Sequence, residues 1–228
     1  MTEYHVKGSF SNVHNNPINT LTAFVIGKLC AKRTLKMRIS LLIIIFSFQC
    51  LAASNTELQK ELVSMAKADQ EVRNKIATIG WKNAPTDLLA KMRLIDTRNT
   101  DRLKEIVEQH SWVTEDSVGK KGVSAAFLIV QHSPDYKFQE EMLPLLKQSF
   151  LNGEGVTGQE FALLTDRILV HQNKPQLYGT QLNILNGELV FDPILDKENV
   201  NKRREEVGLP SMEEYEKIVA EAYGMPVK

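Results

Sequence analysis

Apolar positions recur at near-helical spacing in the first clearly patterned part of the chain. The apolar residues between Leu58 and Val72 follow this spacing, and Gly80 interrupts it. Asn55 or Thr56 precedes the pattern, and the side chain of either residue can cap the first turn of a helix. The pattern therefore predicts a helix that begins at Asn55 or Thr56 and ends at Gly80.

Two shorter helices are predicted next, each with a polar residue at its start. Thr86 precedes residues 87–96, and Asn99 or Thr100 precedes residues 101–110. Each of these side chains can accept a hydrogen bond from the first turn, which favours a helix start at both places.

The middle of the chain alternates polar and strongly apolar segments. Residues 111–122 lack a clear period and predict a loop, whereas residues 123–132 are apolar on every side. Such a segment is typical of a fully buried helix, and a buried strand is the alternative. Residues 135–155 predict a helix with a break or kink at Pro144. The charged residues 196–208 predict a surface helix.

Capping boxes mark the starts of two further helices. Thr157 and Glu160 form one box before an apolar helix, and Ser211 and Glu214 form a second box before the last helix. In this motif the hydroxyl and the carboxylate each satisfy a free backbone N–H group. The two starts are therefore predicted on a specific physical basis.

Asn186-Gly187 predicts the type I′ turn of a β-hairpin. Folding the chain about this turn pairs Leu185 with Glu188, Ile184 with Leu189, Asn183 with Val190 and Leu182 with Phe191. One face of the hairpin is then entirely apolar, and a register shift by one residue would destroy it. The predicted fold is mainly α, a compact single-domain helical bundle with one small β-hairpin at about 178–192.

The N-terminal part of the sequence is typical of an exported protein. Met37-Arg38 is followed by the apolar segment ISLLIIIFSF and by small residues at Ala52 and Ala53. The apolar segment is shorter than the about 20 residues that span a bilayer, although a retained membrane anchor is the alternative. We expect a mis-assigned or disordered extension at 1–36, a signal peptide at 37–53 and one domain at 54–228. The expected location is periplasmic or secreted.

Charge is distributed unevenly along the chain. Six of the 28 basic residues but only one of the 28 acidic residues precede residue 54, so the rest of the chain has a formal net charge of −5. The net negative charge of residues 54–228 argues against nucleic acid as a partner. The expected contact with a membrane is through the signal peptide alone. Both cysteines, Cys30 and Cys50, lie in the segment expected to be removed, which argues against a thiol nucleophile or a disulfide.

Asp166 and Arg167 are the only charged residues between Phe161 and Val170. An unpaired buried carboxylate is unfavourable by several kcal/mol, so Asp166 needs a partner. It can form an ion pair, bind the N–H groups of a loop, or act in catalysis or ligand binding. The polar segment after this helix, which contains His171, Gln172 and Asn173, leads into the hairpin.

Two histidines end predicted helices, which allows either a structural or a chemical role. His132 follows Gln131 at the end of the apolar helix, and His110 ends an earlier one. Each can interact with the helix dipole or serve as a base or ligand. Asp69 and Arg73 have the spacing of an ordinary surface pair on a helix.

Six segments resemble a bacterial domain family of unknown function: ADQEVR, NTDRLKEIVEQHSW, VGKKGVSAAFLIVQHSPD, FQEEMLPLL, LTDRILVHQNKPQLYGTQ and NKRREEVGLPSMEEY. Members of that family carry DQxxR, a helix ending in His-Gly-Trp-Pro, VQHAD, LTDR and YGTQ. This chain has Ser111, Val113 and Ser133 where Gly, Pro and Ala are usual, and these changes affect turns. The resemblance implies a shared site that includes Asp69, Gln70, Arg73, His110, Trp112, Gln131, His132, Asp135, Asp166, Arg167, Gln176, Tyr178, Gly179, Thr180 and Gln181.

Two functions fit these residues. The first is a periplasmic hydrolase in which His110 or His132 is the general base, Asp166 orients it or binds a positive group, and Arg167 holds an anionic group. Tyr178 or Gln181 would stabilise developing charge. The second is a non-catalytic module that binds a small polar ligand or an envelope protein. A metal-dependent variant would need three ligands from His110, His132 and an Asp, either Asp135 or Asp166, but the spacing does not demand a metal. The sequence identifies no cofactor. The ligand-binding residues expected in either case are Asp69, Gln70, Arg73, Trp112, Gln131, Gln176, Tyr178, Thr180 and Gln181.

Overall fold

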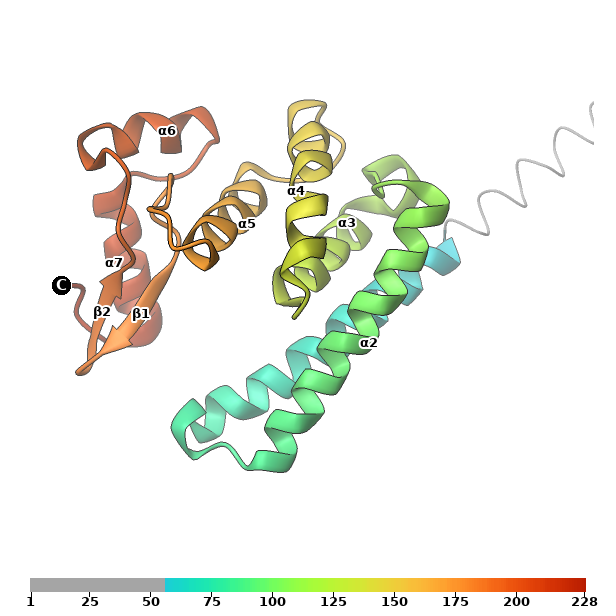
Figure 1. The fold of residues 1–228 in the computed structure, drawn as a ribbon, viewed down its shortest axis with the longest axis horizontal. Helices are drawn as coiled ribbons and strands as arrows, with labels where there is room; N and C mark the ends of the chain where they lie inside the picture. Colours follow the sequence, from blue (N-terminus) through green and yellow to red (C-terminus); the bar gives the residue numbers. More distant parts are fainter. Residues whose placement is uncertain (1–55) are drawn as a thin grey trace, which may run out of the picture. The chain divides into compact units, whose positions relative to one another are not determined.

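The structure, a computed structural model, describes residues 56–228 and is mostly helical (Figure 1). The predicted signal peptide at 37–53 and the extension at 1–36 lie outside the described residues. The first helix covers residues 56–79. The remaining elements are η1 (Trp81–Asn83), α2 (Thr86–His110), α3 (Glu115–His132), α4 (Tyr136–Leu151), α5 (Gly158–His171), β1 (Leu182–Leu185), β2 (Glu188–Phe191), η2 (Lys197–Asn199), α6 (Val200–Glu206) and α7 (Met212–Tyr223).

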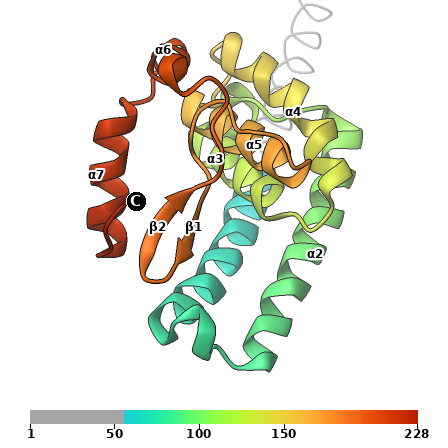
Figure 2. The same ribbon diagram turned by 60° about the vertical axis from the view of Figure 1, so that its left-hand side comes forward.

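The first helix and α2 form an antiparallel helical hairpin, and α3, α4 and α5 pack beside it (Figures 1 and 2). The main core lies among these helices and includes Leu62, Leu103, Val123, Leu146 and Leu164, each fully buried. Most of α3 from Val123 to Gln131 is buried, which confirms the prediction of a buried helix at 123–132. Mainly α with one small hairpin is therefore the observed fold class.

The prediction of two helices between residues 86 and 110 is wrong, because α2 is continuous. Thr86 is the first residue of the helix and does not cap it. Asn99 and Thr100 are buried inside α2, where they form tertiary hydrogen bonds: the Asn99 amide donates to the Met65 carbonyl oxygen and the Thr100 hydroxyl to Ser133 Oγ. Partners outside the helix therefore explain residues whose type suggested a cap.

The prediction of a loop at 111–122 is wrong in its second half. Thr114 and Ser117 form a capping box, and α3 begins at Glu115. The helix is kinked at Gly119, whose φ of 65° and ψ of 166° are not helical. This single irregular position explains why the helical period is hard to recognise in the sequence.

Two further details of the helix predictions need correction. The helix α4 is not broken at Pro144, and Met142 and Leu146 on either side of it are buried in the core. The charged segment 196–208 is not wholly on the surface: Arg204 is only 1% exposed and donates to the carbonyl oxygens of Tyr178 and Pro210. Its guanidinium also lies 4.7 Å from the centre of the Tyr215 ring.

The hairpin has the predicted turn and register, although its strands cover only 182–191. Asn186 and Gly187 have φ values of 55° and 85°, as a type I′ turn requires. The apolar face is only partly covered, with Leu189 fully buried and Ile184 48% exposed. The chain end explains part of this burial, because Leu189 exchanges backbone hydrogen bonds with Pro226 and Lys228.

Both predicted capping boxes, Thr157 with Glu160 and Ser211 with Glu214, are present. None of the helices in the described part of the chain is long and apolar enough to cross a membrane.

Candidate functional site

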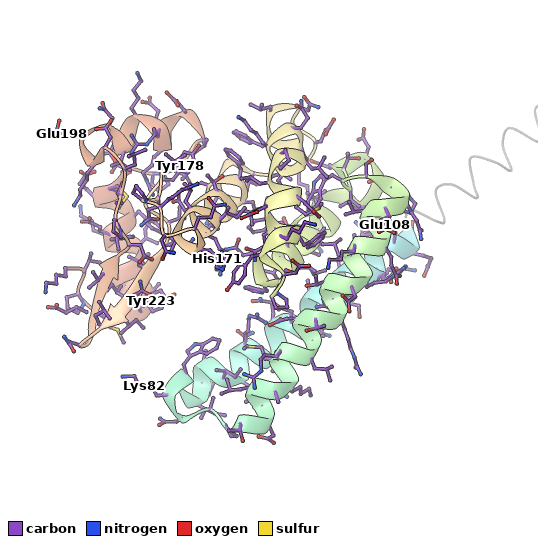
Figure 3. All side chains as sticks on the ribbon, in the orientation of Figure 1. Lys82, Glu108, His171, Tyr178, Glu198 and Tyr223 are labelled. Atoms are coloured by element: carbon purple, nitrogen blue, oxygen red, sulfur yellow. The ribbon has the colours of Figure 1, made fainter. Side chains whose placement is uncertain are left out.

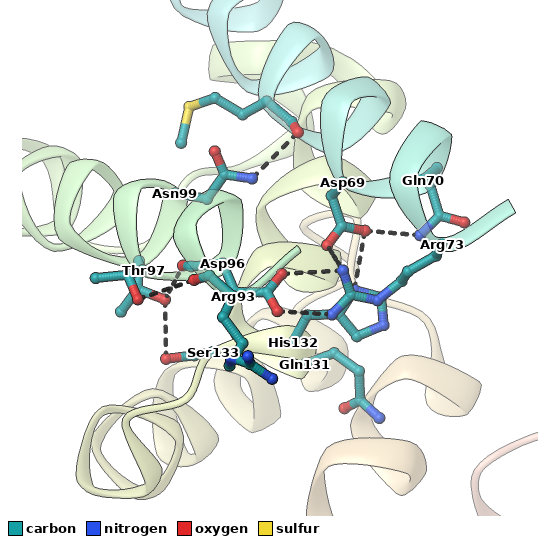
Figure 4. Close-up of polar contacts among 12 residues, drawn as sticks. Asp69, Gln70, Arg73, Arg93, Asp96, Thr97, Asn99, Gln131, His132 and Ser133 are labelled. Carbon is teal, nitrogen blue, oxygen red and sulfur yellow. Dashed lines mark hydrogen bonds and ion pairs between the residues drawn. The ribbon is translucent and has the colours of Figure 1, made fainter. Parts of the chain in front are cut away.

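A buried ionic cluster joins the first helix to α2 (Figure 4). Asp69 is 1% exposed and Asp96 is 7% exposed. Arg73 lies between them, with Nη1 2.5 Å from Asp69 Oδ1 and 2.9 Å from Asp96 Oδ1, and with Nη2 3.0 Å from Asp96 Oδ2. The prediction of an ordinary surface pair at Asp69 and Arg73 is therefore wrong, because the helix face that carries them packs against α2.

His132 brings the end of α3 into the same cluster. Its Nδ1 lies 2.9 Å from Asp69 Oδ2 and 3.0 Å from Oδ1. A carboxylate only accepts hydrogen bonds, so Nδ1 carries the proton when the ring is neutral and Nε2 is then an acceptor. The side chain of His132 is 21% exposed, whereas that of Asp69 is 2% exposed. The pair thus has a buried carboxylate and an imidazole that reaches solvent.

Neighbouring polar groups fix the position of His132 at the end of α3. The Gln139 amide nitrogen, in α4, donates to the carbonyl oxygens of Val130 and Ser133, each at 3.1 Å. Ser133 Oγ also accepts from the Thr100 hydroxyl at 3.0 Å. Because Ser133 and Gln139 are 4% and 1% exposed, these bonds form in a dry environment. They connect the last turn of α3 to α2 and α4.

Opposing effects act on the two carboxylates of the cluster. Burial alone would raise the pKa of Asp69, but the hydrogen bond and charge of His132, a hydrogen bond from Gln70 and the charge of Arg73 hold that pKa below its usual value. Burial raises the pKa of Asp96, and the nearby Asp69 adds to this rise against the opposing effect of Arg73. Asp69 is therefore the member of the pair that favours the ionised form.

Arg167 lies beside the cluster but has no carboxylate partner among the described residues. With the Gln131 amide oriented to satisfy both groups, its oxygen accepts from Arg167 Nε at 2.7 Å and from Nη2 at 3.0 Å. Burial lowers the pKa of Arg167, the charge of Arg73 lowers it further, and Tyr136 opposes this fall. Tyr136 in turn stacks on His171. His171 is labelled at the end of α5 in Figure 3.

Asp166 points to a different place, the loop after α5. Its two carboxylate oxygens accept from the backbone N–H groups of Leu177 (2.7 Å), Tyr178 (3.0 Å) and Thr180 (3.0 Å), and from the Thr180 hydroxyl (2.9 Å). Asp166 is fully buried. Of the roles that the sequence leaves open for it, binding of loop N–H groups is the one that the structure shows. Burial raises its pKa, and these hydrogen bonds oppose the rise.

Gln176 is a second anchor of this loop. Its amide nitrogen donates to the carbonyl oxygens of Gln181 and Asp192, and its own oxygen accepts from the Gln181 N–H at 2.8 Å. The Gln176 side chain thereby ties the loop to the start of β1 and the end of β2. The many polar groups between α5 and the hairpin satisfy one another's hydrogen bonds, which explains why this short segment is so polar.

The structure therefore divides the predicted site residues into groups. Asp69, Gln70, Arg73, Gln131, His132 and Arg167 gather around the ionic cluster, whereas Asp166, Gln176, Tyr178, Thr180 and Gln181 gather in the loop after α5. His110 is exposed at the end of α2. Trp112 is 8% exposed within the main core. Asp69, and not Asp166, is the carboxylate that contacts His132, whereas Asp166 accepts hydrogen bonds from the loop after α5.

Asp96 and Tyr136 are neighbours of the cluster that sequence analysis missed. Asp96, Asn99 and Thr100 are spaced by three and four residues, so they share one face of α2. A polar stripe on a helix that also buries Leu103 and Ile106 is the signal that could have identified Asp96. No comparable signal marks Tyr136, whose importance depends on the packing of α4 against α5.

The charged cluster is not arranged as a metal site. Among residues 56–228, no group of three or more His, Cys, Asp or Glu side chains is placed to hold a metal ion. Both carboxylates instead bind the guanidinium of Arg73. The chemistry available at the cluster is therefore that of an imidazole, two carboxylates and two guanidinium groups.

Comparisons with known proteins give a family but no described activity. No curated protein and no solved structure matches the chain. One family model matches residues 56–228, which is most of the chain, and it is described as a family of unknown function. The chain therefore belongs to the family of unknown function DUF6624.

Proposed function

We propose that the protein is a hydrolase in which His132 is the general acid–base group and Asp69 is the residue that positions it. One observation carries the proposal: a buried carboxylate lies 2.9 Å from Nδ1 of an imidazole that is itself partly open to solvent. A positioned imidazole of this kind is the commonest proton-transfer group in enzymes. The resulting proposal uses Asp69 in the role that the sequence suggested for Asp166.

The geometry supports a specific division of labour between the two residues. With its proton on Nδ1, neutral His132 keeps the lone pair of Nε2 free to accept a proton from water as the water attacks a substrate. The imidazolium that forms is stabilised by the ionised Asp69, and Nε2 then returns the proton to the leaving group. His132 therefore ends each cycle in the protonation state in which it began. Asp69 itself stays ionised throughout.

A non-catalytic binding module for a small polar ligand or an envelope protein is the second candidate. The observation that favours it is the sharing of Asp69, which accepts hydrogen bonds from Arg73 and Gln70 as well as from His132. A carboxylate shared in this way stabilises an imidazolium less than one devoted to the histidine. In the binding module, His132 would donate or accept a hydrogen bond to the ligand without transferring a proton.

Turnover separates the two candidates. The purified protein would be assayed on a panel of chromogenic carboxylic esters, phosphate esters, amides and glycosides. For any substrate that it hydrolyses, His132→Gln is expected to lower kcat by about 10²–10⁴-fold, the usual contribution of a general base. Asp69→Asn is expected to lower kcat as well, while Asp101→Asn, a change at an exposed carboxylate of α2, serves as the control for lost charge.

The pattern of results decides the function. Hydrolysis that persists in His132→Gln at the rate of the unaltered protein would contradict the proposed role of His132. A compound that binds to the unaltered protein and is recovered intact, with affinity that depends on His132, would favour the binding module.

A further inference from the structure

Arg167 differs from Arg73 and Arg102 in how its charge is balanced. Unlike Arg204, which donates to two backbone carbonyl oxygens, it has only a side-chain amide as its partner among the described residues. Arg73 contacts two carboxylates, and Arg102 on α2 contacts Glu61 and Glu105. Arg167 forms no ion pair with any described residue, and its partner is the neutral amide of Gln131. The full charge that acts most on it is that of Arg73, a like charge.

An arrangement of this kind is unfavourable in the empty protein. A guanidinium removed from water requires a counter-charge to offset its lost hydration, and a second guanidinium nearby increases the cost. Both carboxylates of the ionic cluster already bind Arg73, and Asp166, the residue adjacent in sequence, binds the loop after α5. None of the three is therefore in use as the counter-ion of Arg167.

The surroundings of Arg167 are also suited to receiving a ligand. Gln131 holds Nε and Nη2 and so fixes the plane of the guanidinium, while Nη1 has no acceptor among the described residues. Gln131 precedes His132 directly, and Arg73 acts on both Arg167 and Asp69. His171 follows Arg167 by four residues, on the same face of α5, and stacks on Tyr136. Arg167 thus contacts the residue next to the proposed acid–base group and shares a helix face with one member of an exposed aromatic pair.

We propose that Arg167 binds an anionic group, a carboxylate or a phosphate, of the molecule on which His132 acts. This inference deepens the proposed function, because it names the class of substrate for the same site. A guanidinium donates hydrogen bonds in a fixed planar fork that fits the oxygens of either anion. The bound anion would supply the counter-charge that the protein does not.

Anion binding by the purified protein tests this inference directly. Isothermal titration with sodium acetate and with sodium phosphate, at constant ionic strength set with sodium chloride, would compare a planar and a tetrahedral anion. The unaltered protein is expected to bind at least one of them, and Arg167→Gln is expected to weaken that binding by about tenfold or more, as loss of a charge-assisted hydrogen bond predicts. Binding of acetate but not phosphate would indicate that the anionic group of the substrate is a carboxylate. Binding of phosphate but not acetate would indicate a phosphate.

Control variants separate a local effect from a general one. Arg98→Gln removes an exposed positive charge from α2 and is expected to bind the anion as the unaltered protein does. Arg167→Lys keeps the charge but loses the planar fork, so its affinity is expected to lie between those of the unaltered protein and Arg167→Gln. If Arg167→Gln does not fold, Arg167→Lys provides the same comparison.

Several results would overturn the inference. The first is an unaltered protein that binds neither anion. The second is an affinity of Arg167→Gln or Arg167→Lys equal to that of the unaltered protein. The third is a loss of affinity in Arg98→Gln as large as that in Arg167→Gln. Failure of the proposed function is recognised separately, because the titration measures anion binding to Arg167 and needs no turnover, whereas the hydrolysis assay of His132→Gln measures proton transfer. Hydrolysis that depends on His132 but shows no preference for anionic substrates would overturn the role of Arg167 alone.

Discussion

Adjacent residues in α5 serve different parts of the molecule. Asp166 binds the backbone of the loop at 177–180, whereas Arg167 lies beside Gln131 and the ionic cluster. The sequence identifies both as charges that need partners in an apolar helix. It does not reveal the partners, because they lie 11–14 residues away for Asp166 and on another helix for Arg167. Residue type and local spacing therefore identify candidate site residues better than they identify contacts.

Asp166→Asn is expected to destabilise the protein by about 2–4 kcal/mol. The buried N–H groups of the loop at 177–180 lose one of the two carboxylate oxygens as an acceptor, and the amide NH₂ that replaces this oxygen is itself a donor placed against them. Unfolding in urea measures this change. Asp101→Asn, at an exposed position of α2, is the control and is expected to have little effect. A free energy of unfolding for Asp166→Asn within about 0.5 kcal/mol of the unaltered protein would show that the loop does not depend on this carboxylate.

Local signals predict the ends of elements well where backbone groups are satisfied by nearby residues. The two capping boxes and the Asn186-Gly187 turn are confirmed for this reason, since all of their partners lie within a few residues. Asn99 and Thr100 mislead because the same side chains have partners on other elements. The register of the hairpin is predictable, but its incomplete burial depends on how it packs and is not.

Asp135 is a cap whose contribution depends on pH. It accepts from the Phe138 N–H at the start of α4 and forms an ion pair with Lys104 of α2. The hydrogen bond from Lys104, followed by that from Phe138, lowers the pKa of Asp135. A carboxyl group whose pKa is lower in the folded state stabilises the fold above its unfolded pKa of about 4 and loses that contribution as the pH falls through its folded value.

Two substitutions separate the cap from the charge. Asp135→Ala is expected to cost about 1 kcal/mol at neutral pH, because the cap is lost. Asp135→Asn keeps a capping oxygen, so it is expected to be less destabilising and to flatten the fall in stability below about pH 4. Urea unfolding from neutral to acid pH measures both effects. An unchanged acid dependence in Asp135→Asn would show that this carboxylate does not contribute to it.

At the scale of the whole molecule, we propose that the folded domain acts outside the cytoplasm. The support is the basic and apolar pattern from Met37 to Ala53, which precedes the domain that the structure describes from residue 56. Expression in a bacterium is expected to give a periplasmic or secreted protein whose first residue is near Ala53 or Ser54. N-terminal sequencing measures this, and a cytoplasmic protein that retains Met1 would contradict it.

The pairing of His132 with Asp69, 63 residues apart in sequence, is the central claim about the whole domain because it requires the first helix and α3 to meet. Nitrogen-15 NMR of the imidazole, at a pH where the ring is neutral, tests it most directly. We predict a His132 ring protonated on Nδ1 and free at Nε2. In Asp69→Asn the single oxygen is needed by Arg73 and Gln70, so we predict a change to the tautomer protonated on Nε2. A ring protonated on Nε2 in the unaltered protein, or the same tautomer in both proteins, would contradict the account.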